Sequence, residues 1–395
     1  MVCNLTDHHM TLTPSATHSL LTALDRPTEL AENLPREAYT DLEFFRFEMD
    51  RVFFRNWVFV GAAGEIPSPG DAIPLTLCDM PIVLVRQHDG SVKAFHNVCR
   101  HRGPILVREA AKSQSALTCP YHAWSYDLDG TLKRTPAYMG SGRHDSGPLD
   151  KACMGLKRIR CDIWRDGVFI NLSGEAGCLA DVYAPLEQRW KDHDLSLLRY
   201  GGSQRLRINA NWKLAMENFQ EGYHLPMTHP FLNSLSSLEN HYSVVEPAYQ
   251  GQGSHFYDMG QAGHGNLPRF PNLPKYWRNR AEYPAVLPNL MFGMHPDHFL
   301  FFGLIPLSPS LTEEVFHFYF VGEESLAERF AASRERVMSN LRAINAEDVG
   351  VVESMQVGRH SPAYTSAPFS PYQEATLHQF QLKIARMLQQ TGSDR

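Results

Sequence analysis

Residues 99–122, CRHRGPILVREAAKSQSALTCPYH, hold two cysteine–histidine pairs on either side of one insertion. One residue separates Cys99 from His101, two separate Cys119 from His122, and 17 residues lie between the pairs. Two thiolates and two neutral imidazoles are the donors of a 2Fe–2S centre in which cysteines hold one iron and histidines the other. The stretch therefore predicts a 2Fe–2S site on a pair of facing loops.

A structural zinc ion is the alternative at this site, because zinc also accepts two cysteines and two histidines. The one-residue gap in the first pair is unusual for zinc, whose paired ligands usually lie two to four residues apart. Colour separates the two metals, since a 2Fe–2S centre of this kind absorbs visible light and zinc does not.

Residues 211–229, NWKLAMENFQEGYHLPMTH, carry a second set of metal-type ligands. Helical spacing places Glu217, Glu221 and His224 along one face, and His229 follows from a turn beyond the helix. Two histidines with one carboxylate form the facial triad of non-haem Fe(II) oxygenases, which leaves positions open for dioxygen and substrate. His224 and His229 are therefore the predicted histidine ligands of a mononuclear iron.

Asp348 is the predicted carboxylate of this second site. It falls within the apolar stripe of a predicted helix over residues 325–357, seven residues after Leu341. A buried carboxylate is costly unless a partner compensates its charge, and a metal ion is a sufficient partner. Glu347, about 100° around the helix, should face outward. Glu353 is the weaker alternative because it lies off the stripe.

Length, charge and cysteine usage limit the remaining possibilities. The chain has 395 residues, which suggests two structural units, and its formal charge of −6 provides no basic field for nucleic acid or an anionic membrane. We find no run of about 18 apolar residues that predicts a membrane span, and no signal-peptide pattern at the start. Seven cysteines, an odd count, fit a reducing cytoplasm better than a disulfide framework.

The pattern of predicted secondary structure changes near residue 163. Asp-Gly pairs at residues 89–90 and 129–130 mark hairpins between short β segments before this point. After it, strands and helices mix without a βαβ rhythm, so the predicted fold class is α+β. We expect three parts: an N-terminal extension over 1–39, an antiparallel β unit over 40–162 and a larger unit over 163–395.

Two local expectations follow from composition and spacing. Residues 1–38 should be loosely ordered, because they are rich in Thr, Ser, His and Pro and lack an apolar period. A helix should run over 211–224 and end before Pro226, since proline cannot continue it.

Taken together, these motifs resemble the Rieske ring-hydroxylating oxygenase family over most of the chain. The matching segments are Asn97-Val-Cys99-Arg-His101-Arg-Gly103, Cys119-Pro-Tyr-His122-Ala-Trp124, Asn211-Trp-Lys213, Glu221-Gly-Tyr-His224 with His229, Glu347-Asp348 and Gln356-Val-Gly358. The resemblance implies an N-terminal antiparallel β Rieske domain joined to a C-terminal helix-grip domain. It also implies one Rieske 2Fe–2S cluster on Cys99, His101, Cys119 and His122, and one mononuclear Fe(II) on His224, His229 and Asp348.

The resemblance further implies a homotrimer in which the cluster of one subunit serves the iron of its neighbour. Glu221 would be the bridging carboxylate that joins His224 to His122 of the next subunit. A separate NAD(P)H-dependent reductase, with or without a ferredoxin, would supply electrons, because the chain carries no nicotinamide or flavin fingerprint. Dioxygen and a small organic substrate would meet at the iron of this monooxygenase or dioxygenase.

A glutamate at the bridging position narrows the range of substrate classes. Aromatic-ring dioxygenases have aspartate there, whereas Glu221 resembles the branch of carnitine and glycine betaine monooxygenases. This favours hydroxylation or oxidative demethylation of a quaternary or tertiary amine. The alternatives are an oxygenase acting on an aromatic ring or aromatic acid and, outside enzymes, a Rieske electron-transfer protein. The second metal set argues against an electron carrier.

The stretch between His229 and Asp348 should build the substrate pocket. Its apolar side chains could surround a trimethylammonium group or a flat ring, but alternating strand positions more often face a core, so none is assigned to the substrate. The candidates are Phe231, Leu235, Phe256, Tyr257, Met291, Phe292, Met294 and Phe302, with His255, His264, His295 and His298 as polar ones.

Overall fold

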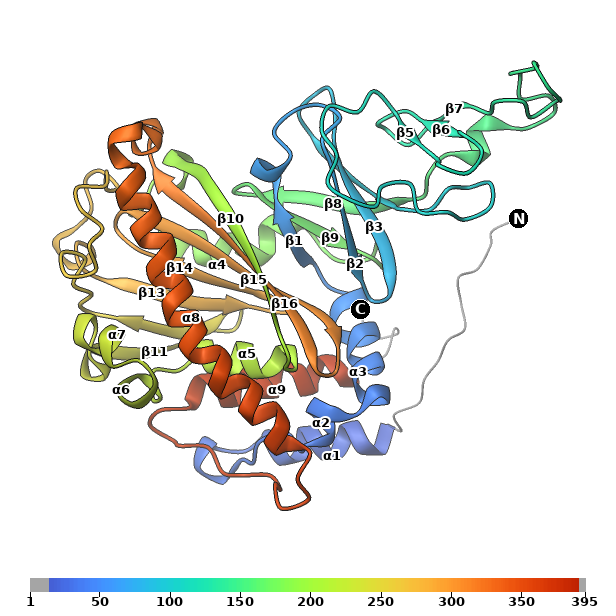
Figure 1. The fold of residues 1–395 in the computed structure, drawn as a ribbon. Helices are drawn as coiled ribbons and strands as arrows, with labels where there is room; N and C mark the ends of the chain where they lie inside the picture. The colour runs from blue at the N-terminus through green and yellow to red at the C-terminus, as the bar shows by residue number, and fades with distance from the viewer. Residues whose placement is uncertain (1–13, 391–395) are drawn as a thin grey trace.

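Seven antiparallel strands form the largest sheet of the computed structural model, which describes residues 14–390. In spatial order they are β10 (Leu198–Ile208), β16 (Leu311–Val321), β15 (His298–Ser308), β14 (Leu290–Met294), β13 (Ala281–Val286), β12 (Gln250–Ser254) and β11 (His241–Val245). The long helix α8 (Ala331–Arg359) lies across one face of this sheet, and α4 (Leu179–Arg189) lies on the other (Figure 1).

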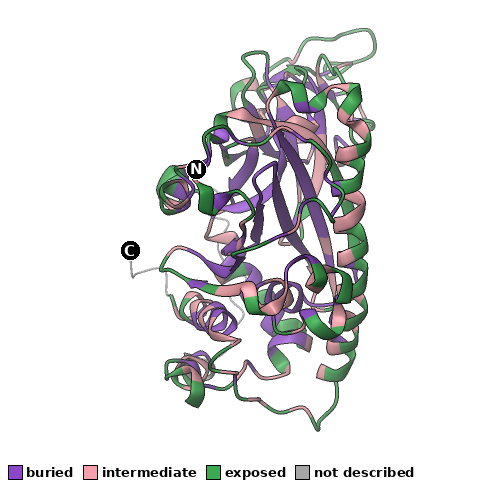
Figure 2. Ribbon diagram, turned by 90° about the vertical axis from the view of Figure 1, so that its left-hand side faces the viewer, coloured by how far each residue is buried: buried purple, intermediate pink, exposed green. Residues whose placement is uncertain are grey.

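Successive side chains of a strand point to opposite faces, and β15 is apolar on both, which explains why both faces of this sheet are covered. On β15, Phe299 and Phe301 pack into the cluster that contains α4, whereas Leu300 and Phe302 point toward α8. Figure 2 shows buried strands in the middle of the molecule and, at its edges, helices whose outer surfaces are exposed. The arrangement confirms the predicted α+β class. None of the helices over residues 14–390 is long and apolar enough to cross a membrane.

Two smaller antiparallel sheets form the N-terminal half. Six strands run in the order β1 (Val58–Ala62), β9 (Gly167–Asn171), β8 (Arg158–Trp164), β4 (Val92–His96), β3 (Met80–Arg86) and β2 (Ala72–Leu77). Three short strands form the other sheet: β5 (Leu117–Thr118), β6 (Ser125–Tyr126) and β7 (Leu132–Arg134). The expected unit boundary at residue 162 falls inside β8, and β9 completes the same sheet.

The segment before the first sheet is more ordered than expected. Helix α1 (Pro14–Leu24) packs along α9 (Ala375–Gln389), and Leu24 and Leu34 are buried. The backbone N–H of Leu34 donates to Gln381 Oε1 at 2.7 Å. Loose order is therefore wrong for residues 14–38. Leu20, Leu21 and Leu24 recur at helical spacing and pack into the core, a stripe too short to stand out in the polar composition of the segment. Residues 1–13 of the expected extension lie outside the described residues.

The predicted helix over 211–224 is wrong in its second half. Helix α5 ends at Phe219, and α6 (Leu225–Thr228) and α7 (Pro230–Leu235) follow it as separate short helices. Pro226 therefore lies in the first turn of α6 rather than beyond the end of α5. A continuous helix would place the Pro226 ring against the carbonyl of Gly222, and glycine itself weakens a helix.

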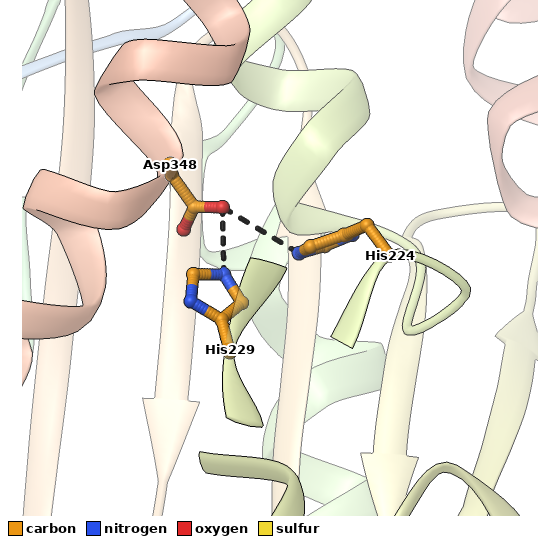
Figure 3. A group of neighbouring side chains, drawn as sticks. All are labelled: His224, His229 and Asp348. Carbon is orange, nitrogen blue, oxygen red and sulfur yellow. Dashed lines mark hydrogen bonds and ion pairs between the residues drawn. The ribbon is translucent and has the colours of Figure 1, made fainter. Parts of the chain in front are cut away.

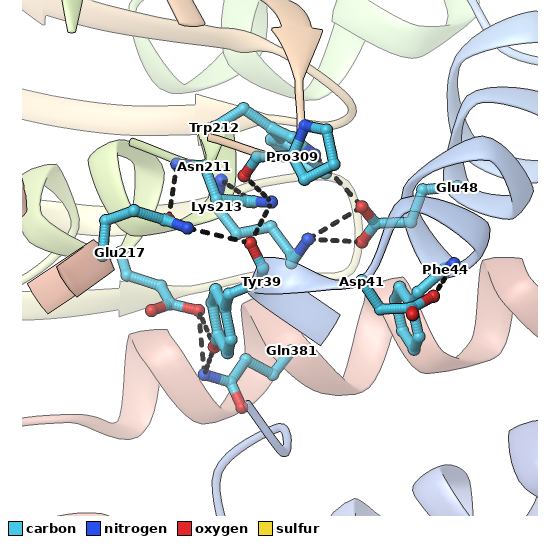
Figure 4. Close-up of polar contacts among 11 residues, drawn as sticks. Tyr39, Asp41, Phe44, Glu48, Asn211, Trp212, Lys213, Glu217, Pro309 and Gln381 are labelled. Carbon is cyan, nitrogen blue, oxygen red and sulfur yellow. Dashed lines mark hydrogen bonds and ion pairs between the residues drawn. The ribbon is translucent and has the colours of Figure 1, made fainter. Parts of the chain in front are cut away.

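Helices α2 (Glu37–Thr40) and α3 (Leu42–Glu48) fasten the N-terminal segment to α5 (Trp212–Phe219) through buried polar contacts (Figure 4). Lys213 Nζ lies 2.7 Å from Glu48 Oε1, and both side chains are fully buried. The hydroxyl of Tyr39 donates to Glu217 Oε1 at 2.7 Å, and Gln381 Nε2 donates to the same oxygen at 2.9 Å. Glu217 is therefore part of a buried hydrogen-bond network in the core.

Lys213→Ala should reduce the free energy of unfolding by about 3–5 kcal/mol, because it leaves the Glu48 carboxylate buried without its cation. Denaturant unfolding of the metal-loaded protein measures this loss. The double variant Glu48→Leu with Lys213→Met removes both charges at similar volume and should recover most of the stability. A loss below about 1 kcal/mol for Lys213→Ala would contradict the prediction.

Candidate active site

Three metal-type ligands converge between α6, the turn after it and α8 (Figure 3). Asp348 Oδ1 lies 2.7 Å from His229 Nε2 and 3.5 Å from His224 Nε2. One ligand atom from each residue lies within 4.8 Å of the other two. The spacing in sequence and the apolar-stripe argument thus selected residues that the fold brings together.

Each histidine of this group is oriented by a glutamate on its other ring nitrogen. His224 Nδ1 lies 2.5 Å from Glu221 Oε1, and His229 Nδ1 lies 2.7 Å from Glu347 Oε2. When Nδ1 donates to a carboxylate, the lone pair of Nε2 is free and directed at a metal. Carboxylate–histidine pairs of this kind are typical supports of metal ligands.

The charge around His229 fits a cation. Burial lowers the pKa of His229, but its contacts with Asp348 and Glu347 outweigh burial and leave that pKa raised. The carboxylates therefore stabilise positive charge at this point. Two imidazoles and one carboxylate, with room for further ligands on the cavity side, are the donor set of non-haem Fe(II). The residues present fit a mononuclear iron.

Two acidic residues near this motif do not belong to the site: Glu217, which was expected on the same face as His224, and Glu353, which was already the weaker alternative to Asp348. Glu217 points into the core, where it accepts a hydrogen bond from Tyr39. Because α5 ends at Phe219, Glu217 and Glu221 do not share a helix face. Glu353 accepts hydrogen bonds from the backbone and side chain of Asn209, at 2.8 and 2.9 Å.

Glu347 is exposed, as expected, but it also makes a contact that was not expected. Its side chain is 44% exposed, yet it reaches around α8 to His229. Helical angles fix where Cβ points, whereas a long side chain can still contact a group that approaches from the flank. The signals in the sequence were its place directly before Asp348 and the matching Glu347-Asp348 segment.

The second ligand set lies on two loops of the N-terminal half. Cys99 and Cys119 are buried, and the rings of His101 and His122 lie 4.9 Å apart. Backbone hydrogen bonds shape both loops: Gly103 N–H donates to the Cys99 carbonyl at 3.0 Å, and a matching bond joins residues 123 and 119 at 3.1 Å. The two loops therefore place the rings of His101 and His122 side by side and bury the thiols of Cys99 and Cys119.

These loops fit an iron–sulfur cluster. His122 Nδ1 is buried without a hydrogen-bond partner among the described residues, as a ligand atom would be. Neither Cys99 nor Cys119 forms a disulfide, and the hydroxyl of Tyr126 lies 3.3 Å from Cys99 Sγ. Burial raises the pKa of Cys99, so its thiolate needs a nearby cation, which iron supplies.

A cavity of about 150 Å³ opens onto His224, His229 and Asp348. Of the predicted pocket residues, Tyr257, Phe302, His264, His295 and His298 line it. The other predicted residues do not line it: Phe231 and Phe256 are exposed, Leu235, Met291, Phe292 and Met294 are buried in the core, and His255 stacks on Tyr242.

The sequence matches two family models. The family described as "Ring hydroxylating alpha subunit (catalytic domain)" matches residues 195–390, and the "Rieske [2Fe-2S] domain" matches residues 56–141. The chain belongs to the Rieske ring-hydroxylating oxygenases. This oxygenase is an O2-dependent oxidoreductase with one Rieske 2Fe–2S cluster and one mononuclear iron per chain. The zinc alternative and the non-catalytic electron carrier are therefore wrong.

Curated relatives of this oxygenase act on amines according to their names. The glycine betaine monooxygenase oxygenase subunit of Chromohalobacter salexigens is 29% identical over 376 residues, which cover 86% of this chain and 82% of that protein. The chloroplastic choline monooxygenase of Arabidopsis thaliana is 28% identical, with 90% of this chain and 82% of that protein covered. The carnitine monooxygenase oxygenase subunit of Escherichia coli is 27% identical, with 85% and 86% covered.

Solved structures share the fold of this oxygenase. A quaternary ammonium Rieske monooxygenase, described as showing inter-subunit electron transfer, has a TM-score of 0.78 at 23% identity, covering 93% of this chain and 98% of that one. Naphthalene 1,2-dioxygenase from Rhodococcus has a TM-score of 0.77 at 21% identity, with 97% and 100% covered. Both substrate classes occur on this fold, so the substrate must be argued from the cavity.

Proposed function

We propose that this oxygenase hydroxylates or oxidatively demethylates a quaternary or tertiary amine. One observation carries the choice of an amine: Glu314 lines the cavity, is buried and has no Lys or Arg partner among the described residues. Within residues 14–390, the only hydrogen bond to its carboxylate comes from Asn345 Nδ2, at 2.7 Å. Burial raises the pKa of Glu314 to about 7, and the charge of Asp348 acts in the same direction. A cationic substrate would compensate the negative charge of this carboxylate, whereas the carboxylate of an aromatic acid would be repelled by it.

Aromatic rings near Glu314 support the same substrate class. Phe302 and Phe316 stack at 4.1 Å between ring centroids, and Phe219 meets Phe302 edge-on at 5.6 Å. All three line the cavity beside the predicted iron ligands. Ring faces attract quaternary ammonium groups, and the attraction grows when water is excluded. A methyl group of the bound cation would then lie close to the iron.

A substrate screen tests the proposal. The metal-loaded protein, a suitable NAD(P)H-dependent reductase and dioxygen are combined with glycine betaine, carnitine or choline in one series, and with benzoate or salicylate in another. Substrate-dependent oxygen uptake with formaldehyde or hydroxylated amine as product is the expected result. Turnover restricted to the aromatic acids would overturn the choice of an amine.

Glu314→Gln should raise KM for the amine on the order of tenfold and change kcat little, because it removes the negative charge but keeps the side-chain shape. Steady-state kinetics at fixed reductase concentration measure both constants. Glu313→Gln is the matched control, since Glu313 is the next residue on β16 and pairs with Arg205 at 3.3 Å instead of lining the cavity. Equal effects of the two substitutions would contradict the role of Glu314.

The proposed roles of the site residues follow from their contacts. His224, His229 and Asp348 hold the mononuclear iron, while Glu221 and Glu347 fix the ring orientation of the two histidines. Cys99, His101, Cys119 and His122 hold the cluster. When bound, the iron supplies the position at which dioxygen is activated. The apolar cavity walls limit water around the substrate.

Electron supply involves partners in this proposal. The cluster loops and α6 lie at opposite ends of the subunit (Figure 1), so a homotrimer in which neighbouring subunits pair the two sites is favoured. Both sites carry exposed apolar side chains suited to such a contact: Tyr121 beside the cluster, and Tyr223 and Met227 beside the iron. A separate NAD(P)H-dependent reductase supplies the electrons.

The proposal also covers the boundary between the two units and the cellular compartment. The smaller unit extends through Asn171 instead of ending at residue 162, because β8 and β9 belong to its sheet. The protein works in the cytoplasm, where a reducing environment keeps its thiols free.

A further inference from the structure

Four buried polar residues at one end of the cavity have no role in holding the iron. They are His264, His295, Asp297 and His298, and the three histidines line the same cavity as Asp348. This group, which we call the histidine cluster, comes from the loop that precedes β13 and from the turn between β14 and β15.

The histidine cluster lies away from Glu314 and Asp348 along the cavity. The loop of His264 is fixed to α8 by Asn340, whose Nδ2 donates to the Ala262 carbonyl at 2.7 Å. Asn340 precedes Asp348 by eight residues, about 12 Å along a helix. On the sheet, Glu314 of β16 is paired with Leu304 of β15. His298 lies six residues before Leu304 on β15, so the backbone positions of His298 and Glu314 are about 20 Å apart along the strands.

Asp297 orients two histidines of the cluster. Its Oδ2 lies 3.1 Å from His264 Nδ1, and its Oδ1 lies 2.7 Å from His298 Nδ1. Burial would raise the pKa of Asp297, but the hydrogen bonds from His264 and His298 outweigh it and hold that pKa far below its usual range. Asp297 is therefore a carboxylate that accepts from Nδ1 of both rings. Nε2 of each ring has no hydrogen-bond partner within residues 14–390.

His295 adds a third unsatisfied nitrogen. Its ring stacks on His298 at 4.2 Å, and its Nε2 lies 3.3 Å from the Tyr283 hydroxyl. His295 Nδ1 is buried and has no partner within the described part of the chain. Buried polar atoms are normally paired, so the unpaired His295 Nδ1 indicates a polar group of a ligand. His264 and His298 line the same cavity, so a ligand there can also reach their rings.

We propose that the histidine cluster is a subsite that binds the carboxylate of a zwitterionic substrate. The inference rests on the proposed function for the ammonium end, which Glu314 contacts beside the iron. Burial lowers the pKa of His298, so the charge of the incoming carboxylate must favour the added protons. In the complex, His264 and His298 each donate Nδ1–H to Asp297 and Nε2–H to the substrate carboxylate. Two imidazolium ions then lie between two carboxylates, and the buried charge sums to zero. Any proton missing before binding comes from solvent.

Matched ligands test the subsite by calorimetry on the metal-loaded protein. The probes are glycine betaine and 4-(trimethylammonio)butanoate, each with its methyl ester, which keeps the cation and removes the negative charge. We expect at least one acid to bind about tenfold or more tightly than its ester. Equal dissociation constants for acids and esters would overturn the subsite.

Two substitutions of His298 separate recognition from structure. Asparagine places its amide near Nδ1, so His298→Asn keeps the Asp297 contact and removes the donor that faces the cavity. It should raise Kd for the acid about tenfold and leave Kd for the ester unchanged. His298→Gln places a donor near Nε2 and should restore part of the acid affinity. His255→Asn, outside the cavity, should change neither constant.

Other outcomes contradict the inference in distinct ways. Equal loss of acid and ester binding in His298→Asn would assign the cluster a structural role. An additional metal ion that disappears in His298→Asn would make the cluster a metal site instead. Binding of choline or the esters alone, with turnover, would leave the amine function intact and refute the carboxylate subsite. Turnover of aromatic acids alone would refute the amine function, and the acid-specific effect of His298→Asn would still test the subsite.

Discussion

Replacing Asp348 with alanine is expected to lower the iron content from about three to about two atoms per chain and to abolish oxygenation. Asp348 is the only carboxylate within reach of both His224 and His229 among residues 14–390. Two neutral imidazoles alone hold Fe(II) weakly and leave its charge uncompensated. The visible spectrum of the cluster should persist, because its ligands lie in the other half of the molecule.

Metal analysis, visible absorption and coupled oxygen uptake together measure this prediction. Glu353→Gln is the control on the same helix, since Glu353 contacts Asn209 and should keep all three irons and its activity. An Asp348→Ala protein with undiminished iron and turnover would remove Asp348 from the proposed ligand set. Loss of cluster absorption along with the iron would instead indicate misfolding.

Local spacing explains why both ligand sets could be predicted from the sequence. The cluster ligands come from two short loops, so Cys99-x-His101 and Cys119-x-x-His122 are visible in the sequence itself. Asp348 is distant in sequence from His229, yet burial made it recognisable, because a carboxylate within an apolar stripe needs a partner. The sequence also predicted the α+β class, but it did not show that both faces of the large sheet are covered, as they are at the continuously apolar β15.

Contacts between distant segments explain what could not be predicted. Glu347 lies one position from Asp348, and only the approach of His229 from the flank of α8 gives it a role. Helical spacing predicted a helix as far as His224, but α5 ends at Phe219, and Gly222, a weak helix former, lies in the gap before α6. The histidine cluster draws on residues about 30 positions apart whose pairing through Asp297 has no sequence period.

Replacing Glu221 with glutamine should keep both metals and reduce turnover on the order of 10–100-fold. Glu221 accepts from His224 Nδ1 and from the backbone N–H groups of Tyr223 and His224, so its carboxylate is fixed at the surface of the iron site. A glutamine still fills this position but carries no charge. It therefore removes the anionic link proposed between His224 and His122 of the neighbouring subunit while leaving the iron ligands in place.

The comparison with Glu347→Gln decides whether Glu221 does more than orient a histidine. Each glutamate contacts Nδ1 of a histidine proposed to bind iron, at 2.5 and 2.7 Å, so loss of orientation alone should affect both variants similarly. If Glu221 also links subunits, reoxidation of the prereduced cluster in one turnover should slow far more in Glu221→Gln than in Glu347→Gln, at equal iron content. Equal slowing would reduce Glu221 to a positioning residue, and wild-type rates in both would remove it from the electron path. Because the cluster band reports oxidation directly, the result does not depend on which amine is the substrate.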